Sequence, residues 1–230
     1  MHFAAMLVGI LLLSALFMPA FGALANTGLV RRYRTREDRP FRISPAAYRK
    51  SAALNAMVSG GLLLGVPLLF RTWLILDASV GWLRTLYESA AILALYDLGY
   101  YLLHRFLLHE WSVGRRIHSV HHTNRTPYAK DSLYIHPIET AAGVGLLLLC
   151  SFAVGPVGAS SFAVVLLIYA LLNVFIHSNI DLPFFPFRSL TALVRNHNIH
   201  HDSMKAGYYA SITPLWDYVF GTAGRPLDRS

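Results

Sequence analysis

Long apolar runs separated by short polar segments dominate the pattern of this chain. The runs cover residues 4–25, 52–70, 86–108 and 141–174. A helix of about 20 apolar residues crosses the hydrocarbon core of a bilayer. The last run is long enough for two helices, with Gly155-Pro156 as the break between them. The pattern predicts an all-α, polytopic membrane helical bundle of about 4–5 spans, in which residues 141–177 form a hairpin.

The first apolar run has a competing interpretation as a secretory signal peptide. Ala23-Leu24-Ala25 is similar to the small-residue site at which such peptides are cleaved. However, no Lys or Arg precedes the run, and the run is long for the apolar region of a signal peptide. We therefore favour a retained span. In the run 52–70, the glycines Gly60, Gly61 and Gly65 predict a place where another helix approaches closely.

Composition supports the membrane interpretation. Only 14% of the residues are charged and 55% are hydrophobic, which is too apolar for an ordinary soluble domain. The net charge of +8 would in isolation permit a nucleic-acid partner, but the basic residues flank apolar runs instead of alternating with polar and aromatic residues, so we exclude one. Cys150 is the only cysteine and lies in an apolar run, which makes it a packing residue and excludes a disulfide within the chain.

Basic residues are distributed unevenly among the polar segments. Residues 31–50 carry eight Lys and Arg, residues 104–138 carry five and residues 188–229 carry five, whereas residues 71–84 carry two and residues 141–174 none. With five crossings, 18 of the 20 basic residues fall on one side of the membrane, which the positive-inside rule identifies as the cytoplasmic side. Pro40 and Pro45 are expected to break any long helix in the basic loop 31–50.

Histidines form three clusters on that same side. Eight of the eleven histidines lie in the boxes His104-x4-His109, His118-x2-His121-His122 and His197-x2-His200-His201. Positions i, i+3 and i+4 share a helix face, so each of the last two boxes can present three imidazoles to one point or straddle two metals. The first pair is five residues apart and can converge only if its helix ends or distorts. So many imidazoles exceed the coordination number of one ion, and the boxes predict two metal ions.

Four further polar residues are candidates for the same site. His177 ends the hairpin and is predicted to be a metal ligand, with Asn173 one turn earlier on the same face. Asp97 lies two turns before His104 and could orient its imidazole, or could make an interhelical hydrogen bond instead. His136 lies where the chain re-enters the membrane, as a ligand or as a group that supports one.

The boxes and their surroundings resemble the fatty acid hydroxylase/sterol desaturase superfamily of membrane di-iron enzymes. Asp97…Tyr101…His104-Arg105 is similar to that family's Asp…Tyr…His-Arg, and His136-Pro137-Ile138-Glu139 to its His-Pro-x-Glu. The segment from Leu215 to Thr222 is close to its terminal Leu-Trp-Asp-x-x-Phe-Gly-Thr. The resemblance covers roughly residues 90–222 and indicates two segments: N-terminal spans with the basic loop (1–85) and a catalytic domain (86–230), its histidines in a cytosolic helical cap.

The resemblance implies both the ligands and the chemistry. The ligands are His104, His109, His118, His121, His122, His177, His197, His200 and His201, with Asn173, a water held by it or His136 as the tenth. Two iron ions, for which zinc can substitute during preparation, would use dioxygen to hydroxylate a C–H bond of a fatty acyl, sterol or related lipid. The chain has no haem motif, dinucleotide fingerprint or cysteine set, so electrons would come from a separate reductase or carrier protein on the cytoplasmic side.

Other functions stay open at this point. Desaturation of the same class of lipid cannot be separated from hydroxylation by the histidine boxes. A zinc-dependent membrane hydrolase would need a metal-bound water and a carboxylate base, for which Glu110 or Asp202 could serve, but nine or ten ligands exceed what such sites use. A metal carrier would need ligands along a path through the membrane, and these lie on one side.

Overall fold

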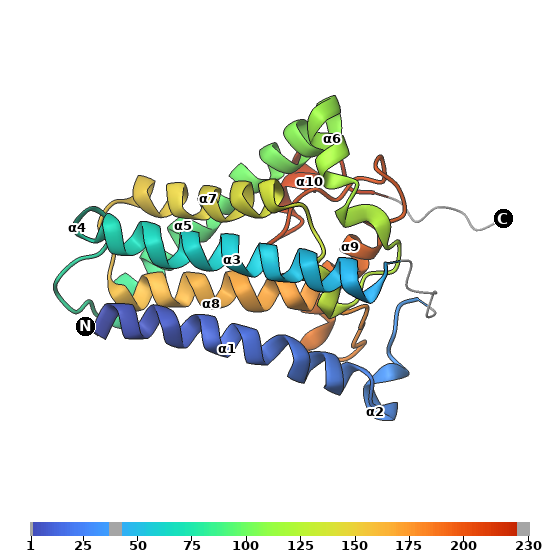
Figure 1. Ribbon diagram of the computed structural model, residues 1–230, viewed down its shortest axis with the longest axis horizontal. Helices are drawn as coiled ribbons and strands as arrows, with labels where there is room; N and C mark the ends of the chain where they lie inside the picture. The colour runs from blue at the N-terminus through green and yellow to red at the C-terminus, as the bar shows by residue number, and fades with distance from the viewer. Residues whose placement is uncertain (1, 37–42, 225–230) are drawn as a thin grey trace.

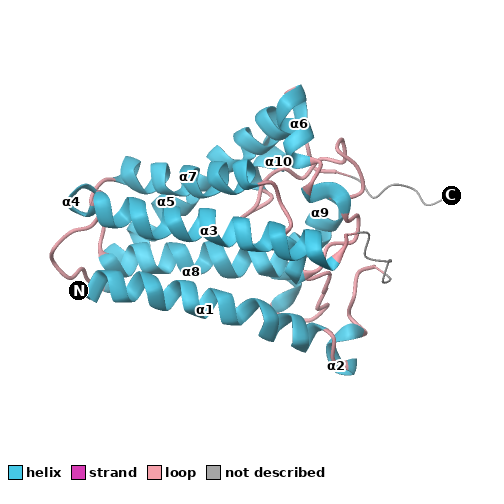
Figure 2. Cartoon of the chain, in the orientation of Figure 1, coloured by secondary structure: helices cyan, strands magenta, loops and turns pink. Residues whose placement is uncertain are grey.

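In a computed structural model that describes residues 2–36 and 43–224, the chain is built from helices and connecting loops (Figure 2). The α-helices are α1 (His2–Ala25), α2 (Gly28–Arg31), α3 (Pro45–Leu69), α4 (Arg71–Leu74), α5 (Trp82–Leu102), α6 (Ser112–His118), α7 (Pro137–Val154), α8 (Ala159–Ile176), α9 (Phe187–His200) and α10 (Leu215–Val219). A π-helix, η1 (Leu103–Glu110), continues α5, and η2 (His121–Thr123) and η3 (Ala129–Leu133) are short 3₁₀-helices. The predicted all-α fold class is confirmed.

Five of these helices are long and apolar enough to cross a membrane, namely α1, α3, α5 with η1, α7 and α8. They run alongside one another as a bundle, with the N-terminus at one end (Figure 1). The shorter helices α6, α9 and α10 lie at the opposite end, which carries all the histidine boxes (Figure 1). The predicted polytopic bundle with a helical cap is therefore confirmed, and the chain is a multi-pass membrane protein.

The hairpin over residues 141–177 forms where the sequence predicts it. Helix α7 ends at Val154 because Gly155 adopts a φ of 97°, a conformation that favours glycine. The buried carboxylate of Glu88 on α5 then accepts hydrogen bonds from the Gly158 amide at 2.8 Å and from the Ser161 hydroxyl at 2.6 Å. These bonds satisfy the first turn of α8 and fix the return of the chain against α5.

The basic loop is shorter than predicted. Pro45 does not break a helix but begins α3, because a proline in the first turn needs no amide hydrogen bond. The Ser44 side chain caps this helix by accepting from the Ala47 amide at 3.2 Å. The side chain of Lys50 therefore belongs to the first turns of a span. Arg39, Pro40 and Arg42 lie outside the described residues.

The two sequence segments pack into one bundle. Leu7 of α1 and Leu63 of α3 share a buried apolar cluster with Ile92 of α5 and Leu147 of α7. The boundary expected between residues 85 and 86 falls within α5. The N-terminal spans are thus part of the same core as the histidine-bearing helices.

The prediction of close helix packing at the α3 glycines is wrong. In the part of the chain that the structure describes, no atom beyond the neighbouring residues and backbone of α3 itself lies within 4 Å of the position that a Cβ would take at Gly60, Gly61 or Gly65. These glycines therefore leave open space beside α3 instead of admitting a neighbouring backbone.

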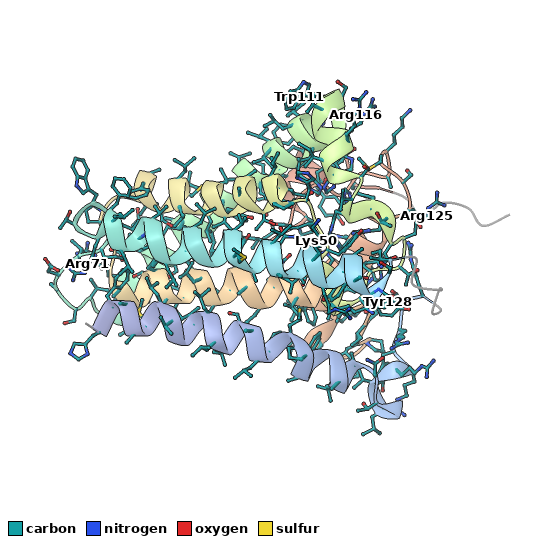
Figure 3. All side chains as sticks on the ribbon, viewed as in Figure 1. Lys50, Arg71, Trp111, Arg116, Arg125 and Tyr128 are labelled. Atoms are coloured by element: carbon teal, nitrogen blue, oxygen red, sulfur yellow. The ribbon has the colours of Figure 1, made fainter. Side chains whose placement is uncertain are left out.

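Basic side chains lie mainly at the end of the bundle that carries the histidines. Lys50, Arg116 and Arg125 are found at this end and Arg71 at the opposite end (Figure 3). This asymmetry agrees with the distribution expected from the positive-inside rule.

Candidate metal centre

All nine histidines predicted as ligands meet in one cluster at this end of the bundle. Seven of them are buried, and His122 and His197 are half-buried. They come from η1, the end of α6, η2, the residue after α8, and α9 with its following residue. Segments almost 100 residues apart in the chain are therefore held together at one point.

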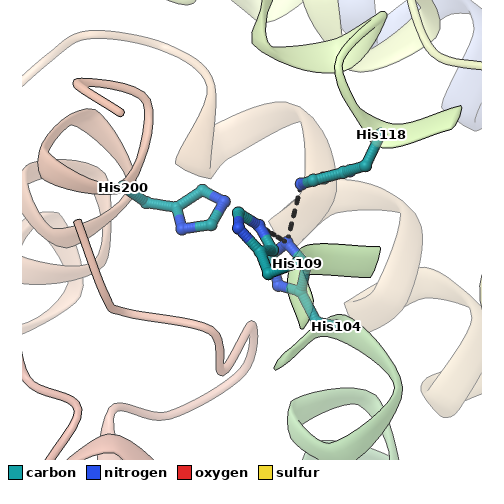
Figure 4. A group of neighbouring side chains, drawn as sticks. All are labelled: His104, His109, His118 and His200. Carbon is teal, nitrogen blue, oxygen red and sulfur yellow. Dashed lines mark hydrogen bonds between the residues drawn. The ribbon is translucent and has the colours of Figure 1, made fainter. Parts of the chain in front are cut away.

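The first group of imidazoles consists of His104, His109, His118 and His200. The Nε2 atom of His104 lies 2.9 Å from that of His118 and 3.3 Å from that of His109. Figure 4 shows how these rings from different helices point their nitrogens toward a common centre. The Nε2 of His122 joins them, 3.1 Å from that of His118 and 3.0 Å from that of His200.

The second group consists of His121, His177, His197 and His201. The Nε2 of His121 lies 3.3 Å from that of His177 and 3.2 Å from that of His201. The Nε2 of His201 is also 3.0 Å from that of His197. The rings of His122 and His201 stack at 4.7 Å between centroids, so the two groups adjoin.

The first box converges because its helix distorts. Residues 103–110 form a π-helix, in which hydrogen bonds join residues five apart. This winding places His109 about one turn beyond His104 on the same face, whereas a regular α-helix would put them about 140° apart. Such π-segments are frequent at functional sites.

The second and third boxes each straddle the two groups. His118 ends α6 and points into the first group, while His121 starts η2 and points into the second. In the third box His200 joins the first group, and His197 and His201 join the second. The predicted sharing of a helix face holds for the third box, whereas the second box changes from α-helix to a turn and a 3₁₀-helix between its histidines.

Hydrogen bonds at the far side of the rings determine which nitrogen carries the proton. A backbone carbonyl can only accept, so an Nδ1 that bonds one must be the protonated nitrogen. Such bonds of 2.6–2.9 Å run from His104 to Tyr209, His109 to Met204, His177 to Asn173, His200 to Gly207 and His201 to Asn124. The Nε2 atoms of these rings therefore face one another as bare lone pairs.

Facing lone pairs about 3 Å apart repel each other unless a cation lies between them. Imidazole nitrogens bind borderline metal ions such as zinc at about 2.0–2.1 Å, which separates neighbouring ligand nitrogens by about 3.0–3.4 Å. The Nε2 separations of 2.9–3.3 Å in both groups fit this arrangement. The donor set thus fits two metal ions bound mainly by neutral imidazole.

Burial keeps the clustered histidines neutral. Desolvation lowers the pKa of His177 to about 4 and, together with the neighbouring His109, that of His200 to about 3. Desolvation likewise holds the pKa of His118, His121 and His201 well below 6.5. At neutral pH these rings are in the form that binds metal.

These lowered pKa values predict acid sensitivity of the metal-free protein. Unfolded histidines take up protons near pH 6.5, whereas folded His177 and His200 do so only near pH 4 and pH 3, so the unfolded state binds more protons in between. The free energy of unfolding should therefore fall as the pH drops below about 6.5. Thermal unfolding of metal-stripped protein across this range would measure it, and a loss that begins only where carboxylates titrate would contradict it.

The family model described as fatty acid hydroxylase matches residues 89–222, more than half of the chain and all nine histidines. The chain belongs to the fatty acid hydroxylase family. Methylsterol monooxygenase 1 of Rattus norvegicus is 31% identical over 147 residues, which cover 61% of this chain and 48% of the relative. Very-long-chain aldehyde decarbonylase GL1-11 of Oryza sativa subsp. indica is 33% identical over 136 residues, 55% of this chain and 48% of that protein.

The chain spans about half the length of these curated relatives. No solved structure matches it. The family match begins within α5 and leaves out α1, α2, α3 and α4.

Glu139 is the residue of this family member's site that the sequence analysis overlooked. Its Oε1 accepts from His118 Nδ1 at 2.8 Å, so a buried carboxylate orients this imidazole where five of the other rings use carbonyls. The signal lies in His136-Pro137-Ile138-Glu139, of which only the histidine is a candidate from the sequence. His136 instead caps α7, its Nδ1 accepting from the Ile138 amide at 3.2 Å, and stands in neither group.

Asp97 makes the second of the two contacts that the sequence offers for it, and Asn173 bonds a histidine through its backbone. The Asp97 carboxylate bonds no histidine; it accepts from the Ile212 amide at 2.9 Å and the Thr213 hydroxyl at 2.6 Å. This is the interhelical alternative, which ties α5 to the segment before α10. The backbone carbonyl of Asn173 accepts a hydrogen bond from His177 Nδ1 at 2.6 Å. Asn173 also lines a cavity next to the cluster.

Gly114 allows η1 and α6 to pack so closely that His104 and His118 can meet. A Cβ at this position would lie 1.6 Å from the carbonyl oxygen of Leu107. Because relieving this clash would require the backbone at Leu107 to move, Gly114→Ala should lower the free energy of unfolding by about 2–4 kcal/mol. A thermal transition lower by roughly 5–15 °C would measure this.

Gly145→Ala is the matched control, because no atom of another segment among the described residues lies within 4 Å of its Cβ position on α7. This substitution should change stability by no more than about 1 kcal/mol. Equal transitions for the two variants would show that Gly114 is not a packing requirement.

Proposed function

We propose that this protein is a membrane-bound, dioxygen-dependent di-iron oxidoreductase that hydroxylates a C–H bond of a lipid. The observation that carries the proposal is the pair of imidazole groups whose bare Nε2 atoms converge, directly above an apolar cavity. Iron in such a site, supplied with dioxygen and two electrons, can oxidise an unactivated C–H bond. The chain's own residues hold the ions, orient the imidazoles, exclude water and position the lipid.

The cavity supplies the place for the substrate. It has a volume of about 570 Å³ and is lined by residues of α1, α3, α5, α7 and α8. His104 of the first group and His121, His177 and His197 of the second form part of its wall. Most of its remaining lining is apolar, which suits a lipid and keeps water from the site.

The names of the relatives support a lipid substrate. A methylsterol monooxygenase and a very-long-chain aldehyde decarbonylase act, by their names, on a sterol and on a long-chain aldehyde. We propose a fatty acyl, sterol or related lipid for this chain as well. Desaturation of the same lipid is the alternative outcome, and product analysis distinguishes the two.

Electrons must reach the site from outside the chain. We propose a separate reductase or electron-carrier protein that docks on the cytoplasmic face, where the basic residues and the histidine end of the bundle lie together. Opposite charge on such a partner would favour its encounter with this face.

The two carboxylates that a zinc-dependent hydrolase could use as a base form ion pairs with arginines. Glu110 pairs with Arg105 at 3.1 Å, and Asp202 pairs with Arg36 at 2.7 Å. Neither is directed at the histidines, and Glu139 is engaged by His118. A metal carrier is disfavoured for a different reason, since both imidazole groups lie at one end of the bundle.

Metal analysis combined with dioxygen consumption tests the proposal. The purified protein, reconstituted with iron(II) in lipid vesicles and given a reductant, should retain about two iron ions per chain and consume dioxygen only when a substrate lipid is present. A protein that holds zinc alone after iron reconstitution and consumes no dioxygen would overturn the proposal.

A further inference from the structure

The cavity below the histidines opens to the outside on one side only. Among the residues that the structure describes, only four of those that line the cavity are also exposed on the surface of the bundle: Val8, Leu12 and Ala15 of α1 and Ala56 of α3. Val8 and Leu12 are 45% and 60% exposed. The lining residues from α5, α7 and α8 are buried or half-buried. The opening is therefore the seam between α1 and α3.

Small side chains keep this seam open on the α3 side. Ala56, Ser59 and Gly60 line the cavity, and no atom of another described segment lies within 4 Å of the Cβ position of Gly60. The next residue, Gly61, also has free space around it but is exposed and does not line the cavity. One residue thus separates the inner rim of the opening from the outer surface of the helix.

The opening lies at the depth of the hydrocarbon core. Leu12 is roughly 15 Å from the start of α1 and roughly 20 Å from its end, at 1.5 Å per residue. Both α1 and α3 are long enough to cross the membrane. Molecules that reach a seam at this depth come from the bilayer, because water-soluble ligands and polar headgroups do not enter the hydrocarbon core.

The cavity is also polarised along its length. Glu139, which bonds His118, and Asn173, which bonds His177, line it beside the histidines, and Glu139 Oε2 is buried there without a hydrogen-bond partner in the described part of the chain. The far end is formed by apolar residues such as Leu63 and Leu166. A lipid that occupied the cavity would place its polar end beside the metal site and its apolar part along α1, α3 and α8.

We propose that a lipid enters this cavity sideways from the bilayer, through the seam between α1 and α3. The seam belongs to helices that lie outside the residues matched by the family model. Substrate access is then controlled by the N-terminal spans of this chain, while the chemistry is carried by the histidine-bearing part. The fate of the lipid rests on the proposed oxidation, but its route does not.

Photolabelling in vesicles tests the route. The full-length protein would be reconstituted with two probes in turn, a long-chain fatty acid carrying a diazirine in its chain and a sterol carrying a diazirine, then irradiated and mapped by mass spectrometry. At least one probe should label inward-facing residues such as Ser14 and Tyr169, which line the cavity and are not exposed. Absence of labelling at these residues with both probes would overturn the proposal.

Two pairs of variants locate the opening. Gly60→Trp should reduce inward labelling at least about tenfold, whereas Gly61→Trp, on the outer face, should leave it unchanged. Ala15→Trp at the rim and Leu16→Trp, which is 68% exposed and does not line the cavity, form the same comparison on α1. If both variants of either pair fold and the probes label their inward-facing residues equally, lipid does not enter through this seam.

Metal content and dioxygen uptake, measured on the same samples, separate this proposal from the proposed function. Rim variants that lose labelling but keep the bound metal of the parent protein support the route. Seam-dependent labelling in a protein that never consumes dioxygen would leave the route intact and reject the oxidation. Lipid-dependent dioxygen uptake that is equal in rim and outer variants would support the oxidation and reject the route.

Discussion

His118→Ala and His197→Ala should each remove one metal ion and abolish lipid-dependent dioxygen consumption. His118 belongs to the first imidazole group and His197 to the second, so each variant damages a different ion site. The metal content should fall from about two ions per chain to about one in both variants. Activity should fall by more than the roughly 10–100-fold that follows from loss of a group that only orients a ligand.

Because the two ions are expected to act as a unit, the double variant should be no less active than either single variant. His136→Ala is the control, since this histidine caps α7 and lies outside both groups. It should keep its metal and most of its activity. If His197→Ala kept full activity after losing an ion, the second group would not take part in the reaction.

Much of the metal site could be predicted because histidine is costly to bury without a purpose. Nine imidazoles at fixed spacings in an apolar chain predicted a metal cluster, and the structure brings all nine together. The convergence of His104 and His109 was conditional on a helix distortion, which the π-helix provides. The assignment of histidines to the two groups was not predictable, because it depends on how the chain turns after α6.

The orienting groups were predicted less well, for a physical reason. The imidazoles are held mainly by backbone carbonyls, for example those of Tyr209 and Gly207, which carry no side-chain signal. Asp97 is a carboxylate at a plausible spacing from His104, but its partners lie 115 residues away and only the fold reveals them. Similarly, the sequence predicts close helix packing at Gly60, whereas the structure has open space there. The sequence alone cannot show what lies opposite a glycine.

Glu139 differs from these orienting groups in being a side chain, and its replacement should weaken metal binding through His118. Glu139→Leu removes the acceptor for His118 Nδ1 and leaves a buried N–H unsatisfied at a cost of about 1–3 kcal/mol. Loss of a carboxylate that orients a ligating histidine typically reduces metal affinity or activity by about 10–100-fold. Metal titration of the stripped protein and dioxygen uptake would measure both.

Glu139→Gln separates orientation from charge, since its amide oxygen can still accept from Nδ1 while the negative charge is lost. A Gln variant that binds metal like the parent would mean that Glu139 acts by holding the ring. A Gln variant that binds metal as weakly as the Leu variant would mean that the negative charge of Glu139 strengthens His118 as a ligand. Glu88→Gln is the control: this carboxylate, 4% exposed, caps α8 away from the cluster, so its loss should reduce stability without changing metal affinity. Equal losses of metal affinity in the Glu88 and Glu139 variants would reduce the role of Glu139 to general stabilisation of the bundle.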